Sequence, residues 1–164
     1  MNTQSFIDQL NREVFLKKKP KRIISLVPSL TDFLHYLSLE EEVVGITRFC
    51  IHPKAWFENK EKIGGTKRVN IDKIIALKPD LIIGNKEENT KEDILALENV
   101  APIWMSDVNS FDDGIDMIMK LGVVLSKEEV CNELVKNLEQ VYNPLKNLGQ
   151  NLSVLYFIWN KPSY

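Results

Sequence analysis

Two side chains near the first third of the chain are suited to metal chemistry. Cys50 and His52 are separated by a single residue, and a thiolate and an imidazole are natural ligands for zinc and similar ions. No third cysteine or histidine stands close to them, because the chain has only two of each. Two interpretations stay open: a metal-binding or metal-dependent enzyme domain, or an ordinary packed loop.

A second group of polar side chains follows a strongly apolar segment. Leu81–Ile83 is short and partly β-branched, which is typical of a strand covered on both faces in a parallel sheet. Polar residues follow it directly at 85–89, with Asn85 and Lys86 at the front. Ligands of open α/β sheets bind just outside the carboxyl ends of the strands. We therefore expect residues 85–89 to border a binding site, although a solvated turn explains them equally well.

Composition and motifs exclude several other functions. The 21 basic and 23 acidic residues nearly balance, so the net charge of -2 gives no reason to expect nucleic acid as a partner. No stretch approaches the ~20 apolar residues of a transmembrane segment. The sequence contains no P-loop, no G-x-G-x-x-G after a strand and no G-x-S-x-G elbow. We expect neither nucleotide chemistry nor hydrolysis of the serine type.

The rest of the chain predicts the elements that must hold these side chains in place. Apolar segments typical of strands lie at 23–27, 43–47, 81–83 and 101–105, with helical periodicity between them. Their alternation favours a Rossmann-like α/β lobe, with a mostly parallel sheet flanked by helices on both faces. Residues 5–16 are expected to form a short amphipathic helix. Polar residues that suit helix N-caps are Ser29, Asn70, Thr90, Ser110 and Ser126.

The last part of the chain predicts a long helix and then a new strand. From Ser126 onward apolar residues recur every three or four positions, and Pro144 should kink this helix or end it early. We divide the chain into an N-terminal helix and basic lead-in at 1–21, an α/β lobe at 22–125, a long helix at 126–149 and a last segment at 150–164. This last segment either adds a strand to the same sheet or, as we favour, starts a truncated second lobe. An alternative is an interaction lobe whose strand at 152–159 pairs with another chain. The apolar positions of the long helix are Val130, Leu134, Leu138, Val141, Leu145 and Leu148.

Several of these segments together resemble one known family. Arg22–Asp32 is similar to the opening of the cobalamin- and iron-siderophore-binding proteins of ABC importers, the class with a helical backbone between two lobes. Val43–Ile46, Ile63–Gly65 and Ile71–Ile83 are similar to the segments that follow in that family. The resemblance implies a substrate-binding protein that does no catalysis and requires no cofactor.

The resemblance also implies a ligand, a partner and a set of binding residues. The expected ligand is cobalamin or a ferric siderophore, and the expected partner is the permease of an ABC transporter. No secretory signal opens the sequence as written, which places the protein in the cytoplasm, or in the periplasm or at the cell surface if a leader was removed. The residues carried over as ligand-facing are Pro28, Ser29, Phe49, Cys50, His52, Gly65, Thr66, Asn85 and Lys86.

Overall fold

The computed structural model describes residues 3–146, 148 and 153, and its centre is a parallel β-sheet. Five strands lie in the order β5–β4–β3–β6–β7, and every neighbouring pair is parallel. After β3 the chain adds β4 and then β5 on one side of that strand, and β6 and then β7 follow on the other side. The strand order therefore reverses between β3 and β6, which is a topological switch point. The strands are β3 (Ile23–Ser25), β4 (Val43–Ile46), β5 (Glu61–Lys62), β6 (Leu81–Asn85) and β7 (Ile103–Ser106).

Helices cover both faces of this sheet. Leu81 and Ile83 of β6 belong to an apolar cluster that also holds residues of α1, α5 and α6, whereas Ile82 packs in a second cluster with residues of α3 and α4. The alternation follows from the two-residue period of a strand. The predicted α/β lobe is thereby confirmed. The helices are α1 (Pro28–Tyr36), α2 (Lys54–Asn59), α3 (Ile71–Leu77), α4 (Lys91–Leu97), α5 (Phe111–Leu125) and α6 (Glu128–Tyr142).

Three of the predicted helix caps are confirmed and two are wrong. The side chains of Asn70, Thr90 and Ser110 each accept a hydrogen bond from the backbone N–H three residues later. Ser29 is no cap, because α1 already begins at Pro28, whose fixed φ suits the first position of a helix. Ser126 ends α5 in the left-handed conformation instead of opening α6, which begins after Lys127.

The N-terminal segment is a β-hairpin and not the predicted helix. β1 (Gln4–Ile7) and β2 (Glu13–Leu16) pair antiparallel as a separate two-stranded sheet. In β2 the buried Val14 and Leu16 alternate with exposed residues, which is the period of a strand. Over the whole segment the apolar residues are spaced as on one face of a helix, which explains the wrong prediction. The turn between the two strands interrupts this spacing.

Asp8 fastens the turn of this hairpin to the edge of the main sheet. Its buried carboxylate accepts hydrogen bonds from the backbone N–H groups of Leu10 and Arg12, both at 2.9 Å, and from Nε of Arg12 at 2.8 Å. It also accepts from the N–H of Met105 in β7 at 3.3 Å. The N–H of Gln9 donates to the Met105 carbonyl at 3.2 Å. These bonds occupy the outer edge of β7, which would otherwise be an open strand edge.

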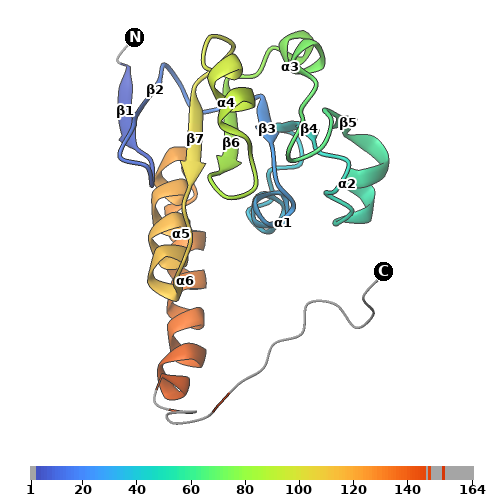
Figure 1. Cartoon of the computed structure of the whole chain (residues 1–164). Helices are drawn as coiled ribbons and strands as arrows, with labels where there is room; N and C mark the ends of the chain where they lie inside the picture. Colours follow the sequence, from blue (N-terminus) through green and yellow to red (C-terminus); the bar gives the residue numbers. More distant parts are fainter. Residues whose placement is uncertain (1–2, 147, 149–152, 154–164) are drawn as a thin grey trace.

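The second half of α6 leaves the apolar core. Leu134 and Leu138 pack against the core, whereas Val141 is 69% exposed. As predicted, the helix stops ahead of Pro144, and a short 3₁₀ turn (Asn143–Leu145) follows. Figure 1 shows α5 and α6 side by side, with α6 projecting past the end of the sheet to which β7 points. The predicted strand at 152–159 lies outside the described residues, apart from Ser153.

The described residues hold no helix that combines the length and the apolar character needed to span a bilayer.

Replacing Asp8→Ala is expected to lower the free energy of unfolding by about 2 to 3 kcal/mol, because several donors and the Arg12 guanidinium lose a buried partner. Urea denaturation followed by circular dichroism measures the change. Ser5→Ala is the control, since the Ser5 hydroxyl makes only an exposed hydrogen bond of 3.4 Å to Glu13. Equal stability of the two variants would contradict the role given to Asp8.

Candidate functional site

A groove of about 460 Å³ lies at the carboxyl ends of the central strands. Its walls come from the segments that follow β3, β4, β5 and β6. Parallel strands end at the same edge of a sheet, and for this reason four segments distant in sequence meet here. The groove also lies at the switch point between β3 and β6, where ligands of open α/β sheets bind. It is lined by Val27, Pro28, Ser29, Phe49, Thr66 and Glu88.

The buried side chain of Asn89 holds three of these segments together. Its Nδ2 donates to the carbonyl of Thr66 at 3.0 Å and to that of Leu26 at 3.4 Å. Its Oδ1 accepts from the N–H of Asn85 at 2.9 Å. One amide therefore satisfies backbone groups after β3, after β5 and at the end of β6, which would otherwise be buried without partners.

A glycine makes room for this amide. A Cβ added to Gly84 would lie 2.7 Å from Oδ1 of Asn89 and 2.8 Å from the sulfur of Met105. Both distances are too short for non-bonded atoms, so the close approach of the amide to β6 requires glycine. Gly84 is thus fixed by packing, although it looks like a strand terminator in the sequence.

Phe49 forms an exposed aromatic wall of the groove. Its side chain is 49% exposed, and the Arg48 guanidinium lies 5.0 Å from the ring centre. The predicted ligand residue Gly65 lies beneath the ring, since a Cβ there would be 3.1 Å from Cε2 of Phe49. Gly65 lets the turn after β5 approach Phe49 closely, and it contributes no side chain to the groove. An apolar ring of this kind suits contact with a flat ligand.

Cys50 is not at the groove, which corrects its assignment as a ligand residue. Its side chain is fully buried in the apolar cluster with α1 and α5. Its Sγ lies 3.1 Å from the hydroxyls of both Thr31 and Thr47. Thr31 also hydrogen-bonds to Ser25 Oγ at 2.8 Å. This buried polar cluster links β3, α1 and the loop after β4, and it shapes the wall of the groove from behind.

His52 lies in a different environment from Cys50. It is exposed, and it does not line the groove. The two side chains therefore offer no common ligand set. Among the described residues no group of three or more histidine, cysteine, aspartate and glutamate side chains is placed to hold a metal ion. The interpretation as a metal centre gains no support.

Asn85 and Lys86 do not line the groove. Oδ1 of Asn85 accepts from the N–H groups of Glu87 and Glu88 at 2.9 and 3.0 Å, so this side chain shapes the loop. The Lys86 ammonium lies 2.6 Å from Oδ2 of Asp107. Hydrogen bonds from Lys86 and from Asn109 hold the pKa of Asp107 below its ordinary value.

Glu88, and not Asn85 or Lys86, lines the groove on this side. It falls within the polar stretch that was expected to border a site, but neither spacing nor residue type singles it out there. Its position depends on how the turn after β6 winds, and Asn85 sets that turn through hydrogen bonds to the backbone.

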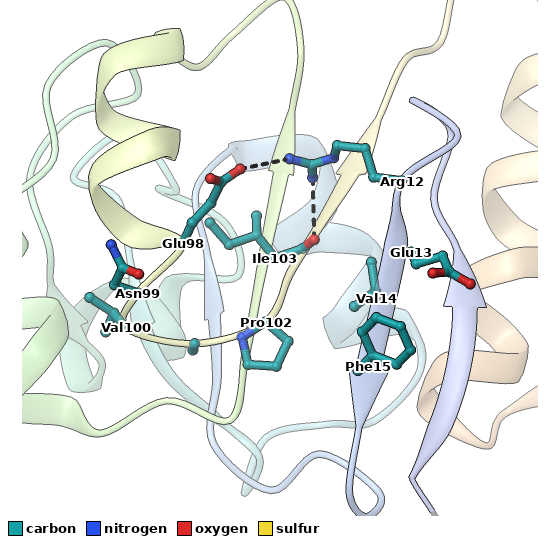
Figure 2. A pocket seen from close by; sticks show the side chains of 10 residues that line it. Arg12, Glu13, Val14, Phe15, Glu98, Asn99, Val100, Pro102 and Ile103 are labelled. Atoms are coloured by element: carbon teal, nitrogen blue, oxygen red, sulfur yellow. Dashed lines mark hydrogen bonds and ion pairs between the residues drawn. The ribbon is translucent and has the colours of Figure 1, made fainter.

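A second cavity, of about 400 Å³, lies at the opposite end of the sheet. Figure 2 shows it between β2 and the start of β7, with Arg12 above Ile103. The guanidinium donates to the Ile103 carbonyl at 3.2 Å and lies 3.6 Å from Glu98, in addition to its bond with Asp8. Because these protein groups already satisfy the Arg12 side chain, we assign the functional site to the groove.

Asn89→Ala is expected to destabilise the fold by about 2 kcal/mol, because buried carbonyl and N–H groups lose their partner. Chemical denaturation measures the loss. Asn99→Ala is the matched control, since Asn99 is exposed and its side chain has no hydrogen bond in the described structure. A loss no greater than that of the control would show that Asn89 does not hold the groove together.

Thiol titration tests the placement of Cys50. Both cysteines are free and buried, and burial raises the pKa of Cys131 above its ordinary value. A water-soluble aromatic disulfide reagent should therefore react with neither thiol until urea unfolds the chain. Rapid reaction of one thiol in the wild-type chain, lost in Cys50→Ala, would place Cys50 at the surface.

Curated proteins with similar sequences have transport or binding names. An uncharacterized ABC transporter substrate-binding lipoprotein of Bacillus subtilis is 30% identical over 150 residues, which are 89% of this chain and 47% of that protein. The vitamin B12-binding protein of Pectobacterium carotovorum is 25% identical over 132 residues, which are 80% of this chain and 48% of that protein. The chain thus spans about half the length of the curated relatives it matches.

Solved structures share the same fold. A siderophore-binding protein, bound to a complex between two molecules of acinetobactin and ferric iron, superimposes with a TM-score of 0.79 at 21% identity, over 92% of this chain and 56% of that one. The periplasmic vitamin B12-binding protein of Vibrio cholerae gives a TM-score of 0.71 at 25% identity, over 81% of this chain and 52% of that one.

A family model identifies the chain. The model is described as a periplasmic binding protein and matches residues 23–161, which include the whole parallel sheet and the groove. The family and the other named relatives are described as binding proteins, and the Bacillus subtilis relative as a substrate-binding lipoprotein of an ABC transporter. The resemblance seen in the sequence is confirmed: the chain belongs to the periplasmic binding protein family.

Proposed function

We propose that this chain is the N-terminal lobe of a solute-binding protein, which binds cobalamin or a related metal chelate for an ABC importer. The observation that carries the proposal is the groove at the switch point, whose walls come from four separate strand ends. This is where a binding protein with a parallel sheet offers its ligand surface. The names of the vitamin B12-binding and siderophore-binding relatives support the class of ligand.

The groove is suited to one side of a ligand larger than itself. Its volume of about 460 Å³ is open to solvent, and Phe49 offers an apolar face at the rim. Binding sites for organic ligands usually bury most of the ligand surface. We propose that a second lobe, beginning at 150–164 after α6, supplies the opposite wall. The exposed apolar residues at the end of α6 support this arrangement.

We further propose an importer permease as the partner, and action outside the cytoplasm. The Bacillus subtilis relative is described as a substrate-binding lipoprotein of an ABC transporter. A lipoprotein name favours the cell-surface or periplasmic location over the cytoplasmic one.

Titration of the ¹⁵N-labelled chain with metal chelates tests the proposed function. Cyanocobalamin, a ferric siderophore and hemin are added in turn, and amide resonances are followed by nuclear magnetic resonance, which detects weak binding. We expect at least one chelate to shift or broaden the resonances of Phe49, Thr66 and Glu88. Resonances of residues such as Asn99, at the other end of the sheet, should not change.

Phe49→Ala should weaken the binding about tenfold, since removing an aromatic contact face costs on the order of 1 to 2 kcal/mol. Phe15→Ala is the control, because Phe15 is similarly exposed at 52% but lies on the hairpin. The proposal is wrong if no chelate changes the groove resonances, or if both variants bind equally well.

A further inference from the structure

Thr66 gives the groove a hydroxyl that has no partner among the described residues. Thr66 is only 8% exposed and lines the groove. Its backbone carbonyl accepts from Asn89, but among the described residues its side-chain hydroxyl makes no hydrogen bond. In the part of the chain that the structure describes, the fully buried side-chain atoms without a partner are Nε1 of Trp56 and Nε1 of Trp104, so the Thr66 hydroxyl itself keeps contact with the groove. This hydroxyl is therefore available to a ligand, as either donor or acceptor.

The first turn of α1 adds hydrogen-bond donors to the same groove. Pro28 and Ser29 are the first two residues of this helix, and both line the groove. The first intrahelical bond runs from the N–H of Thr31 to the Val27 carbonyl, at 3.1 Å. The earlier N–H groups of a helix have no partner within it, and the side chain of Val27 cannot cap them. The N–H of Ser29 has no hydrogen bond among the described residues, and Ser29 lines the same groove as Thr66.

Glu88 adds an acceptor to the same groove. It is the one ionisable residue among those that line the groove, and Asn85 fixes its backbone through the N–H at 3.0 Å. Two cations lie nearby, but both have contacts within the protein. The Arg48 guanidinium lies over Phe49, and the Lys67 ammonium donates to the Glu87 carbonyl.

We propose that this groove recognises uncharged carboxamide groups on the rim of its metal chelate. The carbonyl oxygen of such an amide accepts from the Thr66 hydroxyl and the first turn of α1, and its NH₂ group donates to Glu88. A ligand carboxylate in the same place has no proton to donate to Glu88, and its negative charge is repelled by that of Glu88. The inference rests on the proposed function and narrows it to chelates that carry amides, such as the corrin of cobalamin.

A comparison of matched ligands tests this preference. The ¹⁵N-labelled chain is titrated with cyanocobalamin, with the separated isomers in which one corrin amide is hydrolysed to a carboxylate, and with hemin as a carboxylate-bearing chelate. We expect cyanocobalamin to bind about tenfold more tightly than at least one of the acid isomers and than hemin, as one lost hydrogen bond to a charged group predicts.

Glu88→Gln should abolish most of this preference, because a glutamine amide can donate to a carboxylate as well as accept from an amide. Glu87→Gln is the matched control. It removes the same charge from the neighbouring exposed residue, which does not line the groove, and it should keep the preference. Unchanged amide spectra of both unliganded variants show that the fold is intact.

The possible outcomes separate the two proposals. If chelates bind but acids and amides bind equally, or if the two variants lose the preference equally, carboxamide recognition is wrong and the proposed function stands. If hemin or a ferric siderophore binds and cyanocobalamin does not, carboxamide recognition is likewise wrong and the proposed function stands. If no chelate binds, both proposals are wrong.

Discussion

The groove depends on the hydrogen bonds of one buried amide. Loops after parallel strands carry backbone groups that must find partners once helices cover the sheet. In this chain Asn89 supplies those partners to Leu26, Thr66 and Asn85 at once. A side chain with both donor and acceptor atoms is required, because two of these groups are carbonyls and one is an N–H. The separate loops therefore form one continuous surface.

A second polar cluster supports the other wall from inside the core. Thr31, Cys50 and Ser25 share short contacts between β3, α1 and the loop that carries Phe49. Polar groups in such a position orient the elements around them, because each is costly to bury unless its partners stay in place. Phe49 can remain exposed at the rim because its neighbour Cys50 is anchored beneath it.

Much of the fold could be predicted from the sequence because local signals and packing agree. The apolar run at Leu81–Ile83 is a strand, and Asn70 caps the helix before it. The hairpin was missed because its turn is made by side-chain hydrogen bonds of Asp8, which apolar spacing does not report.

Prediction of the candidate site was less complete, for a physical reason. Pro28, Ser29, Phe49 and Thr66 do line the groove. Position after a strand brings a residue to the correct edge of the sheet, but the winding of each turn decides which side chain faces inward. That winding places Glu88 in the groove and directs Lys86 toward Asp107. The residues next to Cys50 in the sequence likewise do not indicate that its sulfur lies in the core, in contact with the hydroxyls of two threonines.

Because Gly84 and Asn89 are in close contact, these two positions cannot be substituted independently of each other. A methyl group at 84 would overlap the amide oxygen at 89 and the sulfur of Met105, so alanine at 84 requires both a shorter residue 89 and a shift of Met105. Shortening residue 89 first leaves three backbone groups without partners. Each single step is harmful, and a lineage that holds this pair therefore has no easy path away from it.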